Sequence, residues 1–173
     1  LSGYDEASGE STRVWVWDHG AGASACGPYS EGYNDPIDVS WWAAPENGME
    51  GMGCYDDGYS FKLNKDKAYI NDCGEGFLFN WAWANELLGA NQGEYEDAPF
   101  PYDPPESSWE ITYDENDNKI LTLSNNAYIG LAAGVHTYQI LKLTQDTLYL
   151  RFDYDTPEED MWEWDYIRLV AKE

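Results

Sequence analysis

The sequence is poor in basic residues and has no long apolar run. Nine Lys and Arg stand against 33 Asp and Glu in 173 residues, which gives a formal net charge of −24. A surface of this sign repels phosphate backbones and anionic membranes, so we expect no nucleic-acid partner. No segment approaches the roughly 18 consecutive apolar residues of a membrane-spanning helix, so direct membrane insertion is not expected either. Acidic glycans would be repelled in the same way, which leaves neutral polymers as the favoured polymeric ligands.

Histidine and cysteine are scarce as well. His19 and His136 are the only histidines, and no serine lies in a GxSxG motif, so a hydrolase triad has no support. Cys26, Cys54 and Cys73 are too far apart for a paired CxxC metal site. Their odd number allows one disulfide at most and leaves one thiol over.

The length and the aromatic content predict one folded domain. Aromatic residues make up 16% of the chain, which argues against disorder despite the high charge. Residues 1–12 are small and polar and predict a linker, so we assign residues 13–173 to a single domain. The chain begins at Leu1 and shows no signal peptide, and we therefore expect a processed piece of a longer precursor with neighbouring domains.

Alternating apolar residues predict β-strands along most of the chain. No internal repeat of 20 to 50 residues is present, so a propeller or solenoid is not expected. Residues 18–36 predict a loop, and the prolines of residues 94–108 predict a surface excursion. The expected fold is an all-β, antiparallel β-sandwich of jelly-roll type. The strand predictions cover residues 13–17, 38–42, 59–63, 76–83, 109–113, 119–124, 137–143, 146–154 and 161–170, with one or two helical turns as the alternative for 84–90.

The balance among the aromatic residues points to a contact surface. Nine Trp and 14 Tyr accompany only five Phe, and Trp and Tyr carry a polar edge that suits wet surfaces. A sugar ring can lie flat on an indole while its hydroxyls bond nearby polar groups. Covering about 100 Å² of apolar area contributes roughly 2.5 kcal/mol per ring before ordering costs.

The spacing of the tryptophans along the predicted strands indicates which of them could stack on a sugar. Residues at i and i+2 share a face of a strand, whereas the adjacent Trp41 and Trp42 must point to opposite faces, which places one of them in the core. Any of these indoles could instead pack inside the fold. Trp17 and one of Trp41 and Trp42 are the strongest candidates because they adjoin glycine-rich loops. The predicted ligand-binding residues are Trp17, Asp18, His19, Trp41, Trp42, Tyr55, Trp81 and Trp83.

A set of carboxylates raises the alternative of catalysis. Glu158, Asp160 and Glu163 match the ExDxxE spacing of retaining glycosidases, which align a nucleophile and an acid/base. Such spacing arises easily in so acidic a chain, and Pro157 favours a turn there, so we expect no enzyme. Other acids, Asp165 among them, could supply oxygen ligands to a single Ca²⁺, although no EF-hand loop is present.

Several segments resemble a known group of proteins. Residues 15–19 (WVWDH), 27–28, 41–45 (WWAAP), 51–57 (GMGCYDD), 138–141 and 148–151 are similar to surface glycan-binding lipoproteins of Bacteroidota polysaccharide utilisation loci. The resemblance implies an extracellular or cell-surface location with a lipid-anchored precursor, and a β-glucan ligand such as laminarin.

A second resemblance concerns the C-terminal strand. Residues 165–170 (DYIRLV) are similar to the closing strand of laminarinase-like glycoside hydrolases, where the aspartate helps to bind a structural Ca²⁺. The resemblance implies a concave sheet for glucan and a metal role for Asp165. The catalytic carboxylates of that family are missing from the middle of this chain.

These observations lead to one hypothesis and two alternatives. We expect a non-catalytic domain that binds a neutral polysaccharide, β-1,3-glucan or mixed-linkage β-glucan, by aromatic stacking. The alternatives are a laminarinase-like hydrolase and a structural or adhesive β-domain with buried aromatics.

Overall fold

The computed structural model describes residues 1–30, 32–73, 103–130, 135–153 and 163–172, together with the backbone of 76–78 and 98–100. Every regular element in these ranges is a β-strand. No helix long and apolar enough to cross a bilayer is found there. The strands are β1 (Tyr4–Asp5), β2 (Glu10–Ser11), β3 (Val14–Trp17), β4 (Ser24–Pro28), β5 (Trp42–Ala43), β6 (Gly58–Phe61), β7 (Ala68–Asp72), β8 (Gly76–Leu78), β9 (Ala98–Phe100), β10 (Ser107–Tyr113), β11 (Lys119–Leu123), β12 (Thr137–Leu143), β13 (Thr147–Phe152) and β14 (Glu163–Ala171).

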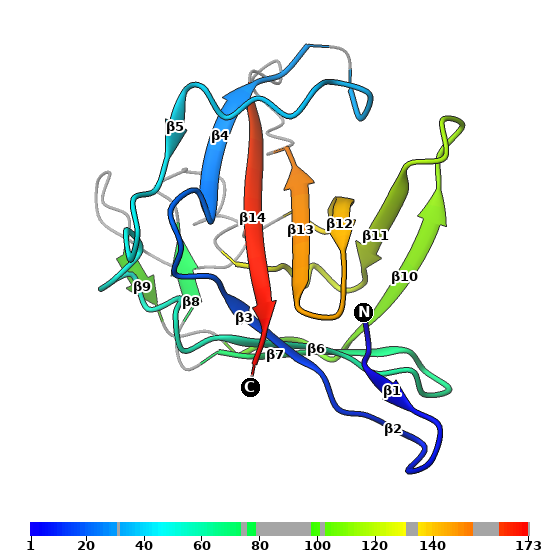
Figure 1. Cartoon of the computed structure of the whole chain (residues 1–173). Helices are drawn as coiled ribbons and strands as arrows, with labels where there is room; N and C mark the ends of the chain where they lie inside the picture. Colours follow the sequence, from blue (N-terminus) through cyan, green and yellow to red (C-terminus); the bar gives the residue numbers. More distant parts are fainter. Residues whose placement is uncertain are drawn as a thin grey trace.

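The main sheet closes on itself (Figure 1). Its strands pair in the order β13-β12-β11-β10-β7-β6-β3-β14, and β14 pairs again with β13. All these pairings are antiparallel. The all-β, antiparallel prediction is therefore confirmed. The pairing describes an eight-stranded barrel, whereas we expected a two-sheet sandwich. Closure through β14 removes the free edges that would separate two sheets.

Strand β14 is long enough to serve two neighbours along one edge. Its residues 163–167 pair with β4, whereas Leu169–Ala171 pair with β3. Strand β5 then pairs with the outer edge of β4. We call β4 and β5 the flap, because these two strands extend from the barrel wall without belonging to the closed ring (Figure 1).

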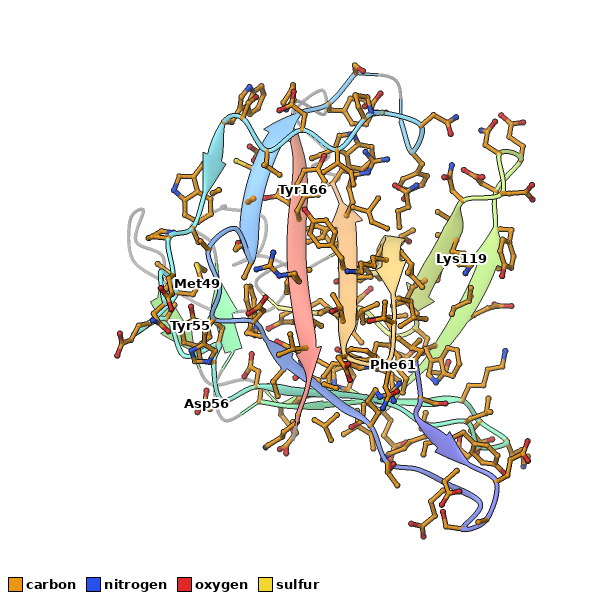
Figure 2. All side chains as sticks on the ribbon, viewed as in Figure 1. Met49, Tyr55, Asp56, Phe61, Lys119 and Tyr166 are labelled. Carbon is orange, nitrogen blue, oxygen red and sulfur yellow. The ribbon has the colours of Figure 1, made fainter. Side chains whose placement is uncertain are left out.

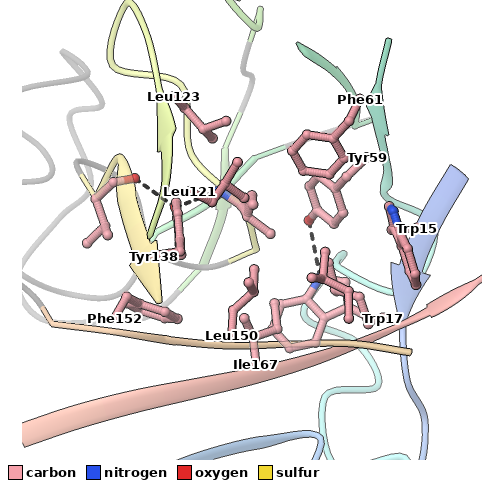
Figure 3. Close-up of a cluster of buried hydrophobic side chains, with 14 of the residues drawn as sticks. Trp15, Trp17, Tyr59, Phe61, Leu121, Leu123, Tyr138, Leu150, Phe152 and Ile167 are labelled. Carbon is pink, nitrogen blue, oxygen red and sulfur yellow. Dashed lines mark hydrogen bonds between the residues drawn. The ribbon is translucent and has the colours of Figure 1, made fainter. Parts of the chain in front are cut away.

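Large side chains fill the barrel interior. Trp15, Tyr59 and Phe61 are fully buried there, with Trp17 beside them (Figure 3). An eight-stranded barrel has an interior that side chains can fill or that can hold one small ligand. The hydroxyl of Tyr59 accepts a hydrogen bond from Trp17 Nε1 at 3.2 Å and donates to Asp57 Oδ2 at 2.9 Å. The polar edges of Trp17 and Tyr59 are thus hydrogen-bonded within the protein.

The strap, residues 32–40, covers part of the outside of the barrel and crosses in front of β14 in Figure 1. The Tyr33 carbonyl accepts hydrogen bonds from Gln139 Nε2 and Arg151 Nη2, at 2.9 and 2.6 Å. The Asp35 carbonyl accepts from Arg151 Nη1 at 2.8 Å. Trp164 and Tyr166 lie in a second hydrophobic cluster on this outer side, with Tyr33 packed against it (Figure 2 labels Tyr166).

Differences from the predicted strands are concentrated in the first half of the chain. Residues 1–12, expected to be a linker, contain the β1–β2 hairpin, and Trp15 Nε1 donates to the Leu1 carbonyl at 2.9 Å. Strand β4 lies in the stretch expected to be a loop. Its small residues give no alternation, and Gly27 is required because a Cβ there would lie 1.8 Å from the Asp38 carbonyl oxygen. Of the predicted strand at 38–42, Trp42 alone lies in a strand, as the first residue of β5.

Candidate functional site

Trp17, one of the strongest predicted sugar platforms, is a core residue. Its side chain is 2% exposed and donates to Tyr59 inside the barrel. Trp15, two residues earlier, lies on the same inner face and is fully buried. The prediction of a ligand-binding role for Trp17 is therefore wrong, because the closed ring covers both faces of its indole.

Trp41 and Trp42 are the exposed pair. Their side chains are 53% and 48% exposed, so neither belongs to the core, contrary to the expectation that one would. The reason is that Trp41 and Trp42 lie at the start of β5, a two-residue strand that ends the sheet, with no strand beyond it among the described residues. Ile37 and Val39 on the strap are exposed as well. We call Ile37, Val39, Trp41 and Trp42 the edge patch.

One face of the flap aligns an indole with carboxylates. Trp42 pairs with Cys26, and Cys26 pairs with Asp165 of β14, so the three side chains share a face. At about 4.8 Å per strand, Trp42 and Asp165 are on the order of 10 Å apart along this row. Burial raises the pKa of Cys26 to about 12, with Glu163 and Asp165 adding to the rise, which places both carboxylates near its thiol.

Asp165 is the acid most shielded from water in this row. Burial raises its pKa well above the usual range, and the charges of Glu163 and Asp153 raise it further. Its Oδ2 has no hydrogen-bond partner in the described part of the chain. Such a group is stabilised by a proton, by a cation or by a ligand hydroxyl that donates to it.

The Ca²⁺ expected at Asp165 can be tested against these residues. The orphan oxygen is the kind of ligand that Ca²⁺ takes. Among the described residues, however, no group of three or more His, Cys, Asp or Glu is placed to hold a metal ion. Asp165 thus supplies one oxygen ligand and not a coordination shell.

The strap positions the edge patch. The carboxylate of Asp35 accepts from Ser30 and from Trp164 Nε1, the latter at 2.8 Å. The guanidinium of Arg151 lies 4.6 Å from the centre of the Trp164 ring and is 1% exposed. These contacts hold the chain immediately before Ile37, so the exposed residues extend from an anchored segment.

Asp18, His19 and Tyr55 have partners of their own. Asp18 forms an ion pair with Arg168. Burial alone would raise the pKa of Asp18, but the hydrogen bond from the Gly20 N–H and the charge of Arg168 outweigh burial and lower it. His19 stacks on Tyr55 with ring centres 3.9 Å apart, and its Nδ1 lies 3.1 Å from Asn47 Oδ1.

The hydroxyl of Tyr55 accepts from the Met49 N–H, and Figure 2 shows these two residues together in the loop before β6. His19 is exposed and Tyr55 is half-buried, so this pair presents a ring at the surface.

Other predicted residues lie elsewhere. Trp81 and Trp83, and Glu158 and Asp160 of the carboxylate set, fall outside the described residues. The three cysteines are free thiols, with Cys54 buried.

Sequence reasoning missed the residues that build the strap. Gln139 and Arg151 lie opposite each other on β12 and β13, and Arg151 Nε donates to Gln139 Oε1 at 2.8 Å. The available signal was a single arginine within the apolar alternation of residues 148–152, since a charge at such a position requires buried partners.

Comparison with models of known families and with curated proteins finds no match to this chain.

Proposed function

We propose that this domain binds a neutral polysaccharide at the edge patch and catalyses no reaction on it. The observation that carries the proposal is a pair of half-exposed indoles, Trp42 on β5 and Trp41 immediately before it, with Trp42 on the same face as Asp165 and Glu163. An indole face takes the C–H side of a sugar ring, and the carboxylates take its hydroxyls. The order of 10 Å between them is comparable to two linked pyranose rings.

The ligand class follows from charge and chemistry. With a net charge of −24, the protein favours an uncharged polymer. The sequence resemblance favours β-1,3-glucan or mixed-linkage β-glucan, bound outside the cell. Binding at this surface does not require a jelly-roll arrangement of two sheets, because the flap beside the barrel supplies the aromatic edge.

Calorimetry against laminarin, mixed-linkage β-glucan and an α-glucan tests the proposal. We expect heat with the β-glucans, and about tenfold weaker binding for Trp41→Ala and for Trp42→Ala, since each removes one stacking surface. Tyr113→Ala is the matched control: Tyr113 is 61% exposed but lies on β10, away from the flap. Absence of heat with every neutral glycan would refute binding, and reducing-sugar release that Glu163→Gln abolishes would show a hydrolase instead.

The structural Ca²⁺ stays a prediction with its own test. If Asp165 helps to hold the ion, Ca²⁺ raises the melting temperature above that in EDTA, and Asp165→Asn removes the difference. Equal melting temperatures in both buffers for the unmodified protein would eliminate the metal.

A further inference from the structure

A pocket lies where the barrel wall is interrupted between β7 and β10. These strands share only two residue pairs, Tyr69 with Ser107 and Ala68 with Ser108. Pro104 and Pro105 precede β10, and proline lacks the N–H that would continue the pairing. The resulting pocket has a volume of about 600 Å³, within the range of ~300–1,000 Å³ that holds small molecules.

The pocket lining is rich in hydroxyl and amide groups. Ser124 Oγ accepts from the Ser108 N–H at 2.8 Å and from Ser108 Oγ at 3.1 Å, which commits its lone pairs and leaves its proton to donate. Asn71 also lines the pocket, and its Oδ1 is buried with no hydrogen-bond partner among the described residues. The pocket lining therefore includes a hydroxyl donor and an amide whose Oδ1 is shielded from solvent and has no partner among the described residues.

Apolar and acidic residues also line the pocket. Ile70, 44% exposed, and the rings of Pro104 and Pro105 supply apolar contact area. Asp66 and Glu106 add negative charge, which disfavours an anion. A purely apolar ligand would leave the serine and asparagine groups without partners. The ligand that matches this mixture is neutral, rich in hydroxyls and partly apolar.

We propose that the β7–β10 pocket is a second saccharide site, which holds one end or a short branch of a neutral glycan. The inference rests on the proposed function for its ligand class, but it uses none of the edge-patch residues. In the order of the closed ring, β10 and β7 lie across the barrel from β14, which carries the flap. Two separate sites on one domain raise the avidity for a polymer that reaches both.

Titration with laminaribiose, cellobiose and maltose, followed by amide shifts in NMR spectra, tests the inference. At least one disaccharide is expected to shift Ser107, Ser108, Ser124 and Asn125, in the unmodified protein and in the Trp41→Ala/Trp42→Ala variant alike. Ile70→Lys removes an apolar wall and is expected to weaken this binding about tenfold. Leu63→Lys is the matched control, because Leu63 is 48% exposed yet does not line the pocket.

The outcomes separate the two proposals. Shifts in the pocket that Ile70→Lys weakens and Leu63→Lys preserves support the second site, even if the edge patch binds nothing. Shifts confined to the edge patch overturn the second site and leave the proposed function standing. An absence of shifts at both places overturns both. Retained dispersion of the spectra shows that each variant is folded.

Discussion

Strand β3 carries Trp15 and Trp17, whereas Trp41 and Trp42 lie at the start of β5, and the two pairs differ in their exposure to solvent. Trp15 and Trp17 are 0% and 2% exposed, whereas Trp41 and Trp42 are 53% and 48% exposed. Strand β3 lies between β6 and β14 in the closed ring, and β5 ends the sheet beyond β4. Both pairs adjoin glycine-rich segments, so local sequence does not distinguish them. The place of the strand in the sheet decides whether its indoles support the fold or remain available to a ligand.

Truncating one tryptophan from each strand should give the largest contrast. Trp17→Ala opens a cavity in the barrel and removes one hydrogen bond to the Tyr59 hydroxyl, so we expect a loss of about 3–5 kcal/mol in the free energy of unfolding. Trp42→Ala is the matched change on β5 and is expected to cost less than about 1 kcal/mol. Urea denaturation measures both. Equal losses would contradict the division into core and edge indoles.

Asp57 is a buried carboxyl group whose ionisation affects the stability of the fold. Burial raises its pKa to about 7, the Tyr59 hydroxyl opposes that rise, and Asp56 and Asp72 add to it. Because the folded pKa exceeds the unfolded value of about 3.9, this group favours folding fully below pH ~4 and loses that contribution as the pH rises through ~7.

Asp57→Asn should therefore be more stable than the unmodified protein at pH 8, by about 4 kcal/mol, and this advantage should shrink toward pH 4. Denaturation of both proteins across this pH range measures the difference, in which the effect of overall charge largely cancels. A difference that does not change with pH would show that Asp57 has an ordinary pKa.

A smaller effect is expected on the outside of the barrel, where Arg151 anchors the strap. Arg151→Met removes the donor to the Asp35 carbonyl and one of the two donors to the Tyr33 carbonyl, so we expect a loss of about 2 kcal/mol and weaker laminarin binding. Arg168→Met is the control, since Arg168 is partly exposed and its ion pair with Asp18 is worth about 1 kcal/mol or less. If both variants bind laminarin as well as the unmodified protein, the strap does not position the edge patch.

The second half of the fold could be predicted from the sequence, and much of the first half could not. Strands β10 to β14 follow clear alternations, so their positions match the predicted runs. Strand β4 has only small residues, and its pairing depends on β14, which lies far along the chain. Closure of the barrel is equally non-local, because it requires β14 to reach both β13 and β3.

The candidate site was predictable only as a set of residue types. The sequence indicated that Trp41 or Trp42 would be exposed, and both are. It also favoured Trp17, since nothing local shows that two further strands enclose β3. Asp165 was selected through a resemblance, whereas its alignment with Cys26 and Trp42 depends on register, which composition does not encode.

Acrylamide quenching of tryptophan fluorescence, with and without laminarin, tests the central claim most directly. Trp41 and Trp42 are open to the quencher in the free protein, and a bound glucan should cover them. We predict that laminarin lowers the quenching constant of the unmodified protein and leaves that of the Trp41→Ala/Trp42→Ala variant unchanged. Quenching that laminarin does not alter in the unmodified protein, or alters equally in the variant, would contradict binding at the edge patch.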